Sequence, residues 1–129
     1  MTRDDWLELT VLERKKYNYL TEVQDVTRQL AESLDRNDQV SARMLVAMRQ
    51  DPIRQLAEVD NGEKVRLSAL PEEGRNRAEA LRRGEPPQGE DERIFAEQAG
   101  KTRRLLEQVV EMDRRASIRM AGEQSFYHK

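Results

Sequence analysis

The chain has no cysteine and only one histidine, so it lacks most of the side chains that catalysis and metal binding use. Without cysteine there is neither a disulfide nor a thiolate metal site. His128 is the penultimate residue, so a nucleophile that needs a histidine base finds none in the body of the protein. We therefore expect a protein that is not an enzyme and that uses neither a cofactor nor a metal ion.

Long apolar runs are also absent, since no stretch approaches the roughly 18 apolar residues of a membrane span. The first residues, MTRDDWLELT, are acidic where a signal peptide would be basic, which predicts a cytoplasmic protein. The 23 basic and 25 acidic residues alternate along the chain and leave a net charge of −2. Neither a nucleic acid nor a membrane is therefore an expected partner.

Phosphate-binding and carboxylate metal motifs are not evident either. The glycines around residues 84–89 are interrupted by Pro86 and Pro87, where a phosphate loop needs free backbone donors. Asp60 and Glu63 come closest to a carboxylate metal site, because they lie near the apolar positions of a predicted helix. We expect instead that these two acids mark a part of the helix that is open to water.

Residues 6–34 contain neither proline nor glycine, and their apolar positions recur at spacings of three and four. This period predicts one long amphipathic helix over about residues 3–35. Trp6, Leu20 and Leu34 widen the stripe, which indicates packing against more than one neighbouring helix. The positions assigned to the buried stripe are Leu9, Leu12, Lys16, Tyr19, Val23, Val26 and Leu30.

A second helix is predicted over about residues 38–70, after the polar turn at residues 35–38. So short a turn folds the second helix back antiparallel to the first. Pro52 should kink or restart this helix, and Asn61 with Gly62 should weaken its middle. Met44 and Met48 are expected to fill the core, although methionines at this spacing also occur on surfaces that bind helices.

Residues 71–90 are rich in glycine and proline and poor in apolar residues, which predicts a linker with at most a short helix over residues 76–83. A third helix follows over about residues 91–121. Its stripe leaves Leu106, Val110 and Ile118 on the flanks, where they meet either the other helices or a partner. Gly122 should stop the helix and leave a tail over residues 122–129.

The predicted fold is thus all-α: one helical domain over residues 1–129, in which a long antiparallel hairpin packs with a third long helix. The result is a three-helix or coiled-coil-like bundle, and a homodimer is left open. This layout resembles the FlgN/FliT family of flagellar export chaperones. The similar segments are the turn Leu34-Asp35-Arg36-Asn37-Asp38-Gln39-Val40 and the start of the third helix, Thr102-Arg103-Arg104-Leu105-Leu106.

The resemblance implies a cytoplasmic, ATP-independent chaperone of type III secretion and flagellum biogenesis. Such a protein holds the amphipathic, helical C-terminal region of a filament or hook-associated subunit before export. The alternative is a self-associating coiled-coil structural or adaptor protein with no client, whose surplus apolar residues form a homodimer interface. The residues predicted to bind the partner are Leu105, Leu106, Val109, Val110, Met112, Phe126 and Tyr127.

Overall fold

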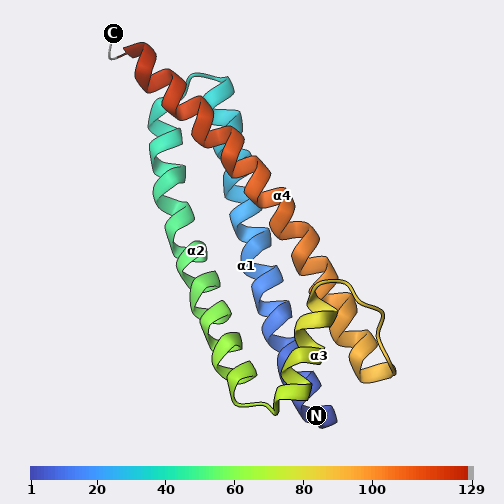
Figure 1. Cartoon of the computed structure of the whole chain (residues 1–129). Coiled ribbons are helices and arrows are strands. Elements are labelled where there is room, and N and C mark those ends of the chain that lie inside the picture. Colours follow the sequence, from blue (N-terminus) through green and yellow to red (C-terminus); the bar gives the residue numbers. More distant parts are fainter. Residues whose placement is uncertain (128–129) are drawn as a thin grey trace.

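The computed structural model describes the backbone of residues 1–127 and the side chains of residues 1–122. Four helices follow one another: α1 (Arg3–Asp35), α2 (Gln39–Ser68), α3 (Glu72–Arg82) and α4 (Glu90–Tyr127). There is no strand in the part of the chain described, so the all-α prediction is confirmed. Figure 1 shows α1, α2 and α4 as long rods, with α3 beside the end of the bundle that holds the N-terminus. Among residues 1–127, no helix has the length and apolar character needed to cross a membrane.

The two ends of α1 are defined by side chains that satisfy free backbone groups. At the start, Thr2 and Asp5 form a capping box, in which each side chain accepts a hydrogen bond from the other residue's backbone N–H. At the far end Asn37 adopts a left-handed conformation (φ 57°), which asparagine tolerates better than most residues. Asp38 then caps α2 by accepting from the backbone N–H of Ser41. The polar turn therefore lies where the sequence predicted it.

Helix α2 runs without interruption through both of its expected weak points. Pro52 lies inside the helix and its ring is buried, and Gly62 is an exposed interior position. The expectation that the helix would restart at Pro52 is wrong, because the α2 residues on either side of the proline pack along α1 and hold it helical. The proline leaves one carbonyl without its helical donor but does not end the helix.

The predicted linker contains a larger helix than the sequence indicated. Helix α3 begins at Glu72, earlier than the expected Asn76, and Ala78 and Leu81 on it are almost completely buried. These two side chains lie in one apolar cluster with Trp6 and Phe95, whose rings contact each other in a tilted arrangement with centroids 5.4 Å apart. Only the remainder of the segment, residues 83–89, is a non-helical connection.

Gly122 does not stop the last helix, because α4 is helical through Tyr127. A glycine in a helix costs only about 1 kcal/mol relative to alanine, and a stop also requires a left-handed conformation that Gly122 does not adopt. The predicted tail over residues 122–129 is thus helical as far as the backbone is described. The side chains of Phe126 and Tyr127 lie outside the described part.

Helix α1 is the centre of the bundle, since it packs along both α2 and α4, while α2 and α4 are not in extensive contact with each other. Three apolar clusters follow one another along α1. The first surrounds Phe95 and the second, in the middle, joins Leu20 and Val23 to α4. The third lies around Leu30 at the turn between α1 and α2. The bundle therefore has one open side, between α2 and α4.

Candidate functional site

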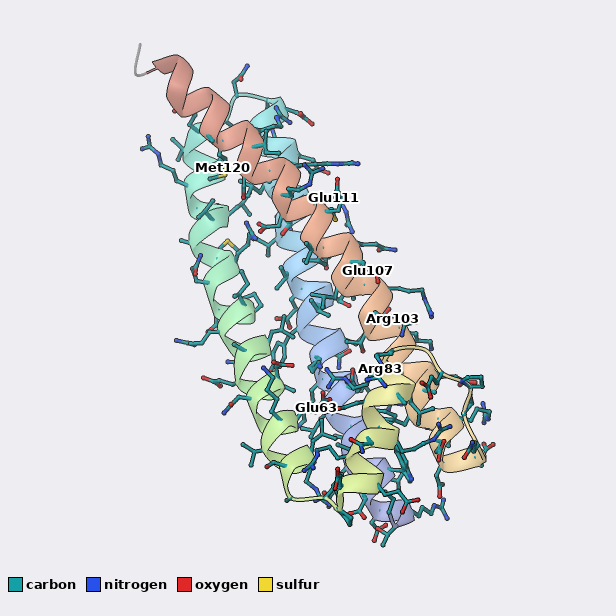
Figure 2. The ribbon with its side chains drawn as sticks, in the orientation of Figure 1. Glu63, Arg83, Arg103, Glu107, Glu111 and Met120 are labelled. Atoms are coloured by element: carbon teal, nitrogen blue, oxygen red, sulfur yellow. The ribbon has the colours of Figure 1, made fainter. Side chains whose placement is uncertain are left out.

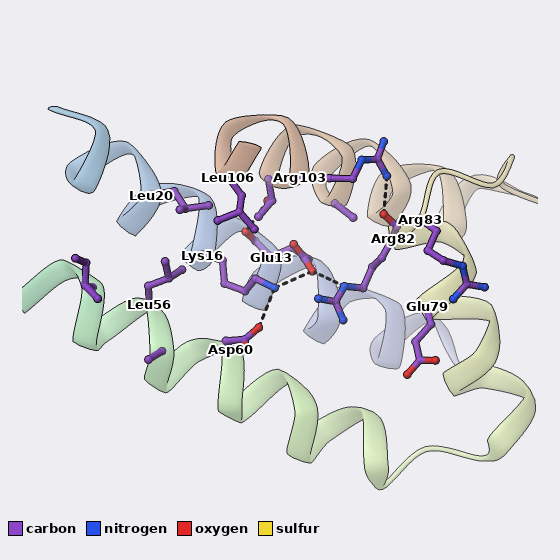
Figure 3. Close-up of a pocket in the computed structure, with 14 residues that line it drawn as sticks. Glu13, Lys16, Leu20, Leu56, Asp60, Glu79, Arg82, Arg83, Arg103 and Leu106 are labelled. Carbon is purple, nitrogen blue, oxygen red and sulfur yellow. Dashed lines mark hydrogen bonds and ion pairs between the residues drawn. The ribbon is translucent and has the colours of Figure 1, made fainter. Parts of the chain in front are cut away.

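A groove of about 690 Å³ lies on this open side, between α2 and α4, with α1 as its floor. We call it the α2–α4 groove (Figure 3). Toward the C-terminus of α4 the two walls are joined by an ion pair between Arg49 of α2 and Asp113 of α4. At the opposite end the C-terminal turn of α3 closes the groove with Arg82 and Arg83. The groove is thus a cleft with two defined ends.

The walls of the groove are largely apolar. Leu56 and Ile53 project from α2, Leu106 projects from α4, and Leu20 lies on the floor. Ile53 and Leu106 are both more than a third exposed. Val110 lies one helical turn beyond Leu106 on the same flank of α4, and it is 58% exposed. Ile53, Leu106 and Val110 form an apolar strip that no described part of the chain covers, above the buried Leu20.

Charged side chains replace the apolar core next to the closed end. The Lys16 ammonium donates to Glu13 Oε1 at 3.4 Å, to Asp60 Oδ1 at 3.4 Å and to Glu63 Oε1 at 3.2 Å. The Arg82 guanidinium reaches the same oxygens of Glu13 (3.4 Å) and Glu63 (3.2 Å). This floor cluster, defined as Glu13, Lys16, Asp60, Glu63 and Arg82, joins α1 to α2 through hydrogen bonds of Lys16 and joins both helices to α3 through ion pairs of Arg82.

Glu63 is the most unusual member of the floor cluster. Its side chain is 1% exposed, and its Oε2 atom is buried without a hydrogen-bond donor. Burial, and then the neighbouring Glu13, raise the pKa of Glu63 to about 7, against the opposing effect of Lys16 and Arg82. The expectation that Glu63 lies open to water is therefore wrong. Asp60, at the edge of the cluster, remains partly exposed.

No group of three or more acids or histidines in the described residues has the arrangement of a metal site. The carboxylates of the floor cluster instead surround the protein's own cations. The groove thus presents apolar side chains along its walls and charged groups at its closed end.

The predicted partner-binding residues separate into two groups. Leu105 and Val109 are 8% and 6% exposed and pack against Leu20 and Val23, so the structure places them in the core. Leu106 and Val110 are 45% and 58% exposed and form the α4 wall of the groove and its extension. Met112 is half-buried, and the side chains of Phe126 and Tyr127 lie outside the described part.

Sequence reasoning missed the α2 wall and most of the floor. Ile53 and Leu56 belong to the apolar stripe of α2, so nothing in their spacing separated them from core residues. Glu13 lies outside the predicted buried stripe of α1, yet it is 1% exposed. The one available signal was Lys16, a cation within the apolar stripe, because a buried cation requires carboxylates nearby.

Comparison with known proteins does not assign this chain to a family. The chain matches no known family model, no curated protein sequence and no solved structure.

Proposed function

We propose that this protein is a binding protein for an amphipathic helix, and that the helix lies in the α2–α4 groove as a fourth member of the bundle. The observation that carries the proposal is the open side itself: Leu106 and Val110 are exposed on the flank of α4 that faces α2. That direction follows from Asp113, seven residues beyond Leu106, which pairs with Arg49 of α2. A helix placed in the groove would bury its apolar stripe against both walls.

The resemblance to the FlgN/FliT family suggests which partner to test first. On that basis we propose a chaperone for the helical C-terminal region of a flagellar filament or hook-associated subunit. A chaperone of this kind needs no catalytic group, because covering the subunit's apolar stripe is sufficient to prevent premature assembly. The groove supports such a role through its apolar walls, and because no helix in the described part of the chain lies across the open side.

The test compares variants of the full chain as bait in a pull-down from native cell lysate, with retained proteins identified by mass spectrometry. The double variant Leu106→Ala/Val110→Ala should lose a flagellar subunit that the wild type retains. It should keep its free energy of unfolding within about 0.5 kcal/mol, because both side chains are exposed. Ile118→Ala is the matched control, since Ile118 is also 58% exposed on α4 but lies beyond the groove.

Two results would contradict this proposal. If the double variant still retains the subunit, the α4 wall does not bind it. If no flagellar subunit is retained by any bait, the family-based choice of partner fails. Leu105→Ala is the control for a core defect. Truncating this buried side chain should lower the free energy of unfolding by about 2–5 kcal/mol.

A second candidate function is self-association through the outer face of α2. Val40, Met44 and Met48 are all at least half exposed, and their spacing of four places them on one face of the helix. The opposite face of α2 packs against α1 through the buried residues Ala42 and Leu45. A molar mass that doubles with concentration, and returns to the monomer value in Met44→Glu, would support a homodimer. A monomer at all concentrations would exclude it.

A further inference from the structure

Unpaired positive charge gathers at the closed end of the α2–α4 groove. Arg83 and Arg103 both line this end, and neither has a carboxylate within ion-pair distance among the described residues. Figure 2 shows the two residues near each other where α3 meets α4. Lys101 and Arg104 do not line the groove, but they line the neighbouring pocket that Arg103 also borders, and they too have no carboxylate partner in the described part. We call these four residues the basic rim.

The floor cluster does not neutralise the basic rim. Its carboxylates already have cations of the protein beside them, because Glu13 and Glu63 each form ion pairs with both Lys16 and Arg82. Asp60 pairs with Lys64 at 3.1 Å in addition to Lys16. Glu79 is the one further acid on the wall of this end, and it makes no ion pair with a described residue. Positive charge therefore exceeds negative charge at the rim.

Arg103 is held in place by its own contacts. Its guanidinium donates to the backbone carbonyl of Arg82 at 2.5 Å, at the C-terminus of α3, where the helix dipole favours a cation. Gly84 lies beneath it with φ +105°, and a Cβ at that position would lie 3.4 Å from the guanidinium. The guanidinium carries five N–H donors and uses one of them here, so others remain for a ligand.

We propose that this closed end recognises acidic side chains at one end of the partner helix, through Arg83 and Arg103. The inference rests on the proposed function and adds the partner's charge pattern to it. The apolar walls specify a leucine-rich stripe, which many helices have. Carboxylates meeting two arginines would fix the register of the helix and select against partners with a basic end. Further along α4 the excess of positive charge ends, since Glu107 follows the basic segment and Glu111 pairs with Arg114 and Arg115 (Figure 2).

The experiment is a selection from a displayed library of helical peptides. Each peptide carries a constant leucine stripe for the groove, and its polar positions are randomised. Wild-type protein should enrich Asp and Glu at one end of the recovered peptides. Arg83→Glu/Arg103→Glu should enrich Lys and Arg there instead. Arg14→Glu/Arg43→Glu is the control, because it changes the net charge equally at exposed positions outside the groove.

Affinity measurements on one selected acidic-ended peptide complete the test. By fluorescence anisotropy, Arg83→Gln/Arg103→Gln should weaken binding about tenfold at low salt, and the loss should shrink as salt rises. Glutamine keeps a hydrogen-bonding side chain at both positions without reversing the charge. The Gln variant therefore still tests the proposal if the Glu variant fails to fold. Binders that require Leu106 but show no acidic preference would overturn this inference alone. Absence of any binder that requires Leu106 would overturn the groove as the binding site, and the inference with it.

Discussion

A buried carboxyl group with a raised pKa makes stability depend on pH, and Glu63 is such a group. Its pKa is about 7 in the folded protein, against an ordinary value of 4.5. Between these pH values the folded chain binds more protons than the unfolded chain, so the free energy of unfolding falls as pH rises. The groups that face Glu63 are Glu13, which favours the protonated form, and Lys16 and Arg82, which oppose it.

We predict that Glu63→Gln removes this part of the pH dependence. Between pH 5 and pH 7 the free energy of unfolding of the wild type should fall by about 2 kcal/mol more than that of the variant, because glutamine cannot ionise. Urea unfolding at several pH values, followed by circular dichroism, measures the difference. Above pH 7.5 the two curves should run parallel. Equal slopes for both proteins across the whole range would show that Glu63 ionises normally in the folded state.

The floor cluster also shows what a sequence reveals about single residues. Lys16 was assigned to the buried stripe of α1 from its spacing, and it is buried. Its partners were not predictable, because Glu63 follows it by 47 positions in the chain and Arg82 belongs to a segment that was expected to be a linker with at most a short helix. Periodicity states which side of a helix is buried. It does not state which residues of other helices lie opposite.

At the scale of the helix, Gly62 is a position where a substitution can stabilise α2 without a new contact to other residues. It lies within the helix, it is exposed, and an added Cβ would meet no atom within 4 Å. We predict that Gly62→Ala raises the free energy of unfolding by about 1 kcal/mol, through the higher helix propensity of alanine and its lower entropy when unfolded. Thermal and urea unfolding measure the gain.

Gly89→Ala is the matched control for that gain. Gly89 also has no atom near its missing Cβ, but its φ is +107°, a conformation that side chains other than glycine rarely adopt. Alanine there should cost about 1–3 kcal/mol because the backbone is strained. A destabilising Gly62→Ala would mean that α2 is not helical at this point.

A helix was predictable from the sequence where its own residues show helical periodicity and end signals. It was less predictable where packing against other helices stabilises it. The bounds of α1 follow from Thr2, Asn37 and the absence of proline and glycine between them. Helix α3 has few apolar residues, and it is stable because Ala78 and Leu81 enter a cluster formed by other helices. Gly122 illustrates the opposite error, in which a residue that often ends helices was given more weight than the helix around it.

On the scale of the whole molecule, the candidate site is a consequence of how the two long helices α2 and α4 pack on the central helix α1. The open side between α2 and α4 could not be predicted, because an exposed Leu106 and a buried Leu105 are equally apolar in the sequence. Paired leucines indicate surplus apolar surface. Their division between core and groove depends on the angle between helices, which the helical period alone does not determine.

Helix α4 takes part in all three apolar clusters along α1, through Phe95, Val109 and Ala116 among others. We therefore predict that a chain ending at Gly89 does not fold cooperatively. The stability of a small domain is only about 5–15 kcal/mol, and loss of α4 opens every cluster at once. Trp6, the single tryptophan, is 6% exposed and contacts Phe95, so it reports this directly.

In the full chain Trp6 should fluoresce at short wavelength and shift to longer wavelength in one cooperative step with urea. The chain ending at Gly89 should emit at long wavelength without denaturant and should melt without a sharp transition. A truncated chain that keeps the short-wavelength emission and a cooperative transition would show that α1 to α3 form an independent core. In that case α4 would be a detachable arm, and the groove would be a space that α4 itself opens and closes.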